Sequence, residues 1–282
     1  FFIIVNIFFI YVEDKNIAVF DRSVETLGED GKMIVYSNMQ SDTLPTLLFW
    51  GDSHTGMLEF DKFQNKYNIV KITTGGCPSL LGTIRRDSTG NSYNCNELLD
   101  RRVIKERIKK IGPDVIILVN RYNIYLYGWI KENLVQEANH YLYTYDSKNN
   151  TLEGRKDAIE SGLYKTINFI ESIGAKCVIV SPFPTIASTG NSKKTYKKGL
   201  RYIKDYRDSY SFDILDSIFD KIENENLLFV DSKLPFLNDS NFMQLHDENL
   251  YSSIYRDDNH LSIISSKKLS KYIINQIDDY FY

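Results

Sequence analysis

The sequence predicts an α/β fold, a three-layer α/β/α sandwich with a mainly parallel, flavodoxin-like sheet. Short apolar runs of strand length alternate along the chain with longer stretches in which apolar residues recur at helical spacing. Strands that are separated by helices are joined by right-handed crossovers, which gives a parallel sheet covered on both faces. Ligands of such sheets bind beyond the carboxyl ends of the strands, so we expect the functional side chains there.

The first strand is expected at residues 46–50, an apolar run that ends at Gly51 and Asp52. Apolar side chains then recur at roughly helical spacing through residues 57–63, which predicts a strand, a tight turn and a helix. Gly51 permits a backbone turn that a larger residue would resist, and Asp52 or Ser53 can cap the new helix.

The later elements alternate in the same way. Strands are expected at 67–73, 114–119, 176–181 and 227–230, and helices at 97–111, 156–173, 205–223 and 263–277. Gly112-Pro113 ends the helix that begins at residue 97, and Gly174 ends the next one. A basic segment with Gly and Ser, residues 185–198, is expected to be a solvated loop.

Ser53 stands in the turn after the first strand, where its hydroxyl would project above the carboxyl edge of the sheet. The first free amides of the following helix point toward the same space and can hold an oxyanion. Gly, Asp and Ser are also the usual residues of an ordinary capped helix start. This segment alone therefore leaves both interpretations open.

A second segment, near the other end of the sequence, favours the catalytic interpretation. A serine hydroxyl is a weak nucleophile until a base takes its proton, and a carboxylate that orients the base improves it. Asp257 and His260 are three residues apart just before a predicted helix, so one turn can present both side chains. Of the four histidines, only His260 has a carboxylate at this spacing in that position. Ser53, His260 and Asp257 are thus the candidate nucleophile, base and orienting residue.

These motifs resemble the first and last sequence blocks of the SGNH, or GDSL-like, hydrolase superfamily. They are most similar to the SGNH domain fused behind the membrane-embedded acyltransferase-3 domain of bacterial surface-polysaccharide O-acetyltransferases. The resemblance spans roughly residues 46–275 and implies the SGNH hydrolase fold and an O-acyltransferase or ester hydrolase. The segments that carry it are Gly51-Asp52-Ser53-His54, Gly75-Gly76-Cys77-Pro78 and Tyr255-Arg256-Asp257-Asp258-Asn259-His260-Leu261-Ser262.

The resemblance also implies an oxyanion hole. Its donors would be the backbone amide of Ser53, a glycine amide after the second strand, here Gly75 or Gly76, and the side chain of Asn120 after the third strand. The sequence departs from the family at this last place, because Val-Asn-Arg-Tyr replaces the usual Gly-x-Asn-Asp block. A role for Asn120 as an ordinary turn cap therefore stays open.

The chain has three cysteines. Cys77 and Cys95 flank a loop rich in Gly, Ser, Thr and Asn, where a crosslink would stiffen the chain, and the resemblance implies a disulfide between them. Cys177 heads an apolar run and is expected to be a buried thiol. The cysteines lack the paired spacing of a zinc site, so no metal and no other cofactor is expected.

Composition is that of an ordinary globular protein, with 43% hydrophobic residues, 25% charged residues and a net charge of −3. Nothing in it indicates a nucleic-acid partner. Residues 1–12 are nearly all apolar, but a membrane span needs roughly twenty residues, so we expect the end of a transmembrane helix. A truncated signal sequence, which would lack a small-residue cleavage site here, and a buried strand are the alternatives. Residues 13–45 are expected to be a linker or appendage, and residues 46–282 the SGNH catalytic domain.

These features predict serine-dependent transfer of an acyl group, most simply acetyl, to or from a carbohydrate hydroxyl. The expected setting is the extracytoplasmic domain of a surface-polysaccharide O-acetyltransferase, tethered to the cytoplasmic membrane. Its expected partners are a cell-surface glycan acceptor and an acyltransferase-3 membrane domain as the acyl donor. A carbohydrate O-acetylesterase would carry the same triad, and a noncatalytic glycan-presenting domain would keep the fold.

Overall fold

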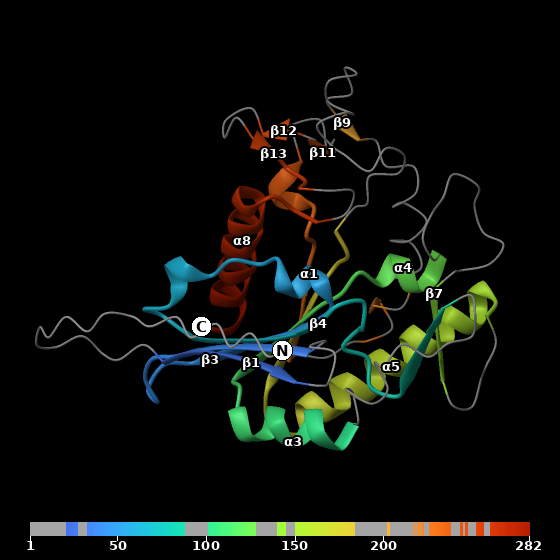
Figure 1. The fold of residues 1–282 in the computed structure, drawn as a ribbon, viewed down its shortest axis with the longest axis horizontal. Coiled ribbons are helices and arrows are strands. Elements are labelled where there is room, and N and C mark those ends of the chain that lie inside the picture. Colours follow the sequence, from blue (N-terminus) through green and yellow to red (C-terminus); the bar gives the residue numbers. More distant parts are fainter. Residues whose placement is uncertain are drawn as a thin grey trace, which may run out of the picture.

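A seven-stranded sheet lies at the centre of the computed structural model, with helices on both of its faces (Figure 1). The structure describes residues 21–27, 33–87, 101–127, 140–144, 150–183, 202–203, 217, 219–220, 222, 226–237, 243–244, 246–247, 252–256 and 260–282. This architecture confirms the predicted α/β/α sandwich.

The parallel part of the sheet has the strand order β4-β3-β6-β8-β10. Its members are β3 (Thr46–Gly51), β4 (Asn68–Thr74), β6 (Val115–Val119), β8 (Lys176–Val180) and β10 (Leu227–Val230). Numbered along the chain, this is the 2-1-3-4-5 order of flavodoxin-like folds. Gly51 pairs with Thr73 on one side and Val119 on the other, so the carboxyl ends of these strands lie level.

Two antiparallel strands extend the sheet where the sequence predicts a linker. β1 (Asp21–Leu27) pairs with β2 (Met33–Met39), and β2 pairs with β4. Residues 21–27 and 33–39, within the segment 13–45 expected to be a linker or appendage, therefore belong to the sheet. The reason is tertiary: β2 covers the open edge of β4, and Val35 joins the core.

Helices enclose two apolar layers, one on each face of the sheet. α3 (Arg101–Ile111) and α5 (Leu152–Ser172) cover one face, and α1 (Ser53–Gly56) and α8 (Ile263–Phe281) lie on the other (Figure 1). Alternate residues of β3 enter different layers: Leu48 packs in the core of the α3 and α5 face, and Leu47 in that of the α8 face. Both faces of the parallel strands are therefore buried, as predicted.

The observed ends of the helices agree in part with those predicted from the sequence. Gly112 and Gly174 follow α3 and α5 with φ values of 62° and 77°, a conformation that favours glycine. The helix expected through residues 57–63 stops after one turn at Gly56, and a 3-10 turn, η1 (Asp61–Phe63), follows. The chain between them bonds to α8 instead, because the Glu59 amide donates to Ser270 Oγ at 3.0 Å.

The remaining elements were not expected from the sequence. They are α4 (Tyr122–Tyr127), η2 (Leu234–Phe236) and three antiparallel strand pairs, β5 (Thr83–Asp87) with β7 (His140–Thr144), β9 (Tyr202–Ile203) with β11 (Met243–Gln244), and β12 (His246–Asp247) with β13 (Ser252–Ser253). The helix expected at 205–223 and the apolar segment 1–12 lie largely or wholly outside the described residues. Over the described ranges, no helix combines the length and apolarity needed to cross a membrane.

Candidate active site

Ser53 is the first residue of α1, directly after β3, and its side chain is half-buried. Asp52 caps the helix, because its Oδ1 accepts a hydrogen bond from the His54 amide at 2.9 Å. Gly51 is required by close packing: a Cβ atom there would overlap the carbonyl oxygen of Val119 on β6. The strand, turn and helix start are thus as predicted, and a neighbouring strand adds a constraint on glycine.

His260 lies against the serine. Its Nε2 and Ser53 Oγ are 3.0 Å apart, although 207 positions separate the two residues in the sequence. Nε2 can accept the serine proton only in the neutral tautomer that carries its hydrogen on Nδ1. The His54 ring packs edge-on against the His260 ring, with centroids 5.5 Å apart, which restricts the orientation of the base.

The backbone on either side of residues 257–259 is tied together. Arg256 N donates to His260 O at 2.8 Å, and Ser262 N donates to Ile254 O at 2.8 Å. Leu261 N also donates to Met57 Sδ at 3.3 Å, which connects this segment to the chain just after α1. Asp257, the candidate orienting carboxylate, lies outside the described residues, and its role stays a prediction.

Asp52 has a second function besides capping α1. Its carboxylate is 1% exposed, and its Oδ2 accepts hydrogen bonds from the Arg121 amide at 2.8 Å and from the Tyr125 hydroxyl at 2.9 Å. Burial, and then the charge of Asp52, raise the pKa of Tyr125 well above its usual value, so the hydroxyl keeps its proton and remains a donor. The turn that carries Ser53 is therefore fixed to the start of α4.

Gly75 and Gly76 lie at the same edge of the sheet. They are the central residues of a turn that the Cys77 amide closes by donating to Thr74 O at 3.0 Å, and Gly76 has a φ of 68°. A positive φ at only the second central residue defines a type II turn, in which the closing bond leaves both glycine amides unused. Thr73 Oγ1 donates to Asp52 O at 2.7 Å and so holds this turn next to Ser53.

Asn120 follows β6 as expected, but its side chain is fully engaged. It is 1% exposed, and its two amide hydrogens go to Ser79 Oγ at 2.8 Å and Tyr122 Oη at 2.9 Å. Its oxygen accepts from the Ser79 amide at 2.9 Å. A side-chain amide has only two hydrogens, so Asn120 would have to exchange one of these bonds to serve an oxyanion. Its oxyanion role remains a prediction, and the observed geometry is that of a clamp between β6 and Ser79.

The cysteines differ in state. Cys77 forms a disulfide, and Cys95, the partner that the family resemblance implies, lies outside the described residues. Cys177 is a free, buried thiol as expected, and burial raises its pKa far above the usual value.

Two residues near the site were not predicted from the sequence. Arg85 on β5 is 3% exposed, and it donates to the Gly76 carbonyl. Tyr125 joins Asp52 from α4, a helix too short to predict. The only hint was the occurrence of an arginine beside apolar residues in the run 80–84, where a buried charge is costly.

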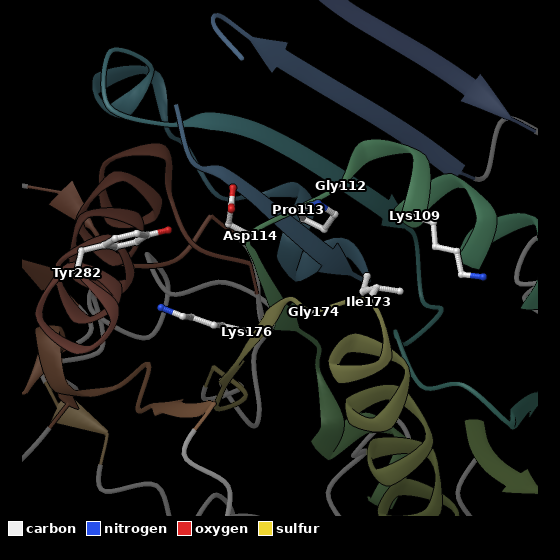
Figure 2. A pocket seen from close by; sticks show the side chains of 8 residues that line it. All are labelled: Lys109, Gly112, Pro113, Asp114, Ile173, Gly174, Lys176 and Tyr282. Carbon is white, nitrogen blue, oxygen red and sulfur yellow. The ribbon is translucent and has the colours of Figure 1, made fainter. Parts of the chain in front are cut away.

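A groove of about 580 Å³ lies away from Ser53, at the amino-terminal ends of the parallel strands β6 and β8. Figure 2 shows Asp114 and Lys176, at the amino-terminal ends of β6 and β8, beside Gly174 and Tyr282 in its lining. The length of the strands separates this groove from Ser53, which follows the carboxyl end of β3. It is not part of the candidate site.

Comparisons with known proteins concern the family and the fold of the chain. A family model described as "SGNH domain (fused to AT3 domains)" matches residues 20–275. Among solved structures, the periplasmic domain of a lipopolysaccharide acetyltransferase from Salmonella ser. Paratyphi A is 18% identical, with a TM-score of 0.57 and coverage of 84% of this chain and 85% of that chain. At this identity the likeness shows the shared fold alone.

Two further solved structures are more distant. A GDSL-like lipase from Bacteroides thetaiotaomicron VPI-5482 is 15% identical, with a TM-score of 0.44 and coverage of 83% of this chain and 88% of that chain. An acetylxylan esterase from Geobacillus stearothermophilus is 16% identical, with a TM-score of 0.44 and coverage of 83% and 94%. A search of curated proteins found no match.

Proposed function

The chain belongs to the family of SGNH domains that are fused to AT3 domains, and from this premise we propose that it is the catalytic domain of a surface-polysaccharide O-acetyltransferase. It has the SGNH hydrolase fold and is an enzyme that transfers acyl groups or hydrolyses esters. The contact between Ser53 Oγ and His260 Nε2, at 3.0 Å, carries the proposal, because a base within hydrogen-bond distance of a serine hydroxyl can activate it as the nucleophile that acyl transfer needs.

The reaction has two halves. Ser53 Oγ attacks the carbonyl carbon of the acetyl donor while His260 Nε2 takes the hydroxyl proton. The resulting tetrahedral intermediate collapses as His260 returns this proton to the leaving group, and an acetyl-serine ester remains. In the second half His260 takes the proton of an acceptor hydroxyl, whose oxygen attacks the ester, and the proton then returns to Ser53 Oγ.

Negative charge develops on the acetyl oxygen in both halves. We propose that the amide of Ser53 and the amides of the Gly75-Gly76 turn hold this charge. The type II geometry of that turn and its attachment to Asp52 through Thr73 support the assignment. Asp257 is proposed to accept the Nδ1 hydrogen of His260 and to support the imidazolium.

The acceptor distinguishes the transferase from an esterase. A sugar hydroxyl gives an acetylated glycan, whereas water gives acetate from the same acetyl-serine ester. We propose the transferase because the family is described by its fusion to AT3 domains, and this description supports a membrane partner for the domain. In this proposal the domain is extracytoplasmic and tethered to the membrane, the AT3 domain supplies the acetyl group, and a cell-surface glycan accepts it.

Hydrolysis of a chromogenic acetyl ester tests the nucleophile and base. We expect Ser53→Ala and His260→Ala each to lose roughly a thousandfold or more in kcat, because both act in the transition state. Ser41→Ala, at an exposed serine, is the matched control and should retain wild-type rates. Far-UV circular dichroism checks that each variant is folded. Equal rates in wild type and Ser53→Ala would refute the proposal.

A second measurement tests the acceptor. The enzyme is given the chromogenic ester together with a polysaccharide, and acetate release is compared with acetyl groups on the glycan, measured by mass spectrometry. A transferase diverts acetyl groups from water to the glycan in a Ser53-dependent manner. If only acetate is released, and its rate of release is the same with and without each glycan tested, the esterase is favoured.

A further inference from the structure

Arg85 is a buried cation that the reaction described above does not use. Its side chain is 3% exposed, on the strand β5, where it pairs with Leu142 of β7. Removing a guanidinium group from water is costly unless its surroundings compensate. Two contacts of the Arg85 side chain indicate a function at this position.

The first contact is with the glycine turn. Arg85 Nη1 donates a hydrogen bond to the carbonyl oxygen of Gly76, the residue that takes φ 68° in the turn. A carbonyl that is held in this way fixes the peptide plane that follows Gly76. The guanidinium group therefore holds the turn from outside, in addition to the bond from Cys77 to Thr74 that closes it.

The second contact is with the support of the nucleophile. The guanidinium carbon lies 5.8 Å from the ring centroid of Tyr125, whose hydroxyl donates to Asp52 Oδ2 at 2.9 Å. Asp52 in turn caps the helix that begins with Ser53. One planar cation thus contacts both parts of the site, the turn with the candidate oxyanion amides and the residue that supports the serine. The planar fork of arginine suits this double contact better than the single point charge of lysine.

We infer that Arg85 is a positioning residue of acyl transfer, which fixes the Gly75-Gly76 turn relative to Ser53 so that its amides meet the developing oxyanion. The inference rests on the proposed function. Arg85 acts through the glycine backbone and makes no contact with the substrate in this role. Loss of the guanidinium group should therefore lower the rate of the chemical step far more than it weakens substrate binding.

The test compares Arg85→Met and Arg85→Lys with wild type on the acetyl ester. Removing one oxyanion donor lowers kcat by about a hundredfold to a thousandfold. A loosened turn keeps its donors but places them less well, so we expect kcat to fall by roughly tenfold to a hundredfold. We expect a loss in this range for Arg85→Met with KM within about twofold, and a smaller loss for Arg85→Lys, which keeps the charge. Arg86→Met, at the neighbouring arginine of the same strand, is the matched control and should leave kcat unchanged.

A covalent probe separates the inference from the proposed function. A fluorophosphonate reacts with an activated serine: a bond forms between Ser53 Oγ and phosphorus, fluoride leaves, and His260 takes the proton. Its phosphoryl oxygen occupies the place of the oxyanion. If wild type and Ser53→Ala are labelled alike, the proposed function itself fails. If wild type is labelled and the Arg85 variants are labelled equally fast, only the inference about Arg85 fails.

Chemical rescue decides the case in which Arg85→Met folds poorly. Arg85→Ala leaves a space of guanidinium size, and added guanidinium ion, at concentrations too low to unfold the protein, should raise its kcat and labelling rate. The same ion should not accelerate Arg85→Met, whose side chain fills the space. Absence of rescue in folded Arg85→Ala, or rates that only follow the folded fraction of each variant, would overturn the inference.

Discussion

The substitution Asp52→Asn tests whether one carboxylate holds the nucleophile turn in place. Asp52 accepts hydrogen bonds from the His54 amide, the Arg121 amide and the Tyr125 hydroxyl, and it is 1% exposed. An asparagine has the same shape but only one acceptor oxygen. If that oxygen takes the place of Oδ2, its amide group faces the N–H of His54, and two donors oppose each other in a buried site.

The magnitude follows from these bonds. A buried donor left without an acceptor costs about 1–3 kcal/mol, and the two bonds that remain lose their charged acceptor, at about 1 kcal/mol together. We therefore expect a loss of about 2–4 kcal/mol in the free energy of unfolding. For a chain of this size about 2–4 °C accompanies each kcal/mol, so the thermal midpoint should fall by roughly 5–15 °C.

Asp114→Asn is the matched control for this measurement. Asp114 is exposed, and its Oδ2 accepts a bond from the Thr46 amide at 2.7 Å. One acceptor oxygen is enough there, so we expect a change within about 0.5 kcal/mol. Thermal unfolding followed by circular dichroism compares the two variants. Equal, small shifts in both would refute the argument that Asp52 fixes the turn through its three bonds.

Three further predictions concern the same edge of the sheet. Gly51→Ala should destabilise the protein by more than about 3 kcal/mol in chemical denaturation, because its methyl group would overlap the Val119 carbonyl on a neighbouring strand; a variant of wild-type stability would contradict this packing. Asn120→Ala should lower stability by about 1–3 kcal/mol with a modest effect on kcat if the clamp is its role, whereas a hundredfold loss in kcat at full stability would restore its oxyanion role. Burial raises the pKa of Tyr122 and Tyr125, so the folded state holds protons that the unfolded state releases above its tyrosine pKa of 10. The contribution of these two tyrosines to stability should therefore be constant below that pH and fall above it, and Tyr125→Phe should reduce the slope above pH 10 in a pH series of denaturant titrations.

The parallel core of the fold could be predicted from sequence because its signals are local. An apolar run such as that of β6, or a helix that ends at Gly112, is visible within a few residues. β1 and β2 could not be recognised in this way, since they gain their stability from the edge of β4, a partner distant in the sequence. Similarly, the chain that follows the short helix α1 bonds to Ser270 through the Glu59 amide, and Ser270 lies more than two hundred positions away.

In the candidate site, too, the residues of local sequence motifs could be predicted, and those that depend on distant contacts could not. Ser53 and His260 belong to motifs of a few residues, and the structure brings these two side chains together. Arg85 and Tyr125 belong to no motif, because their importance arises only when β5 and α4 meet at Asp52 and Gly76. Asn120 was found by its place after a strand, but its hydrogen bonds to Ser79 depend on a loop that the sequence does not position.

The 207 positions between Ser53 and His260 also have a kinetic meaning. His260 reaches the serine only when α8 has docked on the sheet through Leu269, Ile273 and Ile277, which closes a very long loop and is therefore expected late in folding. An intermediate organised around β3, β4 and β6 would contain the nucleophile and the glycine turn but no base. Catalytic activity is thus a stringent reporter of complete folding, and in a refolding experiment it should return with the last structural phase rather than with the first burial of the sheet.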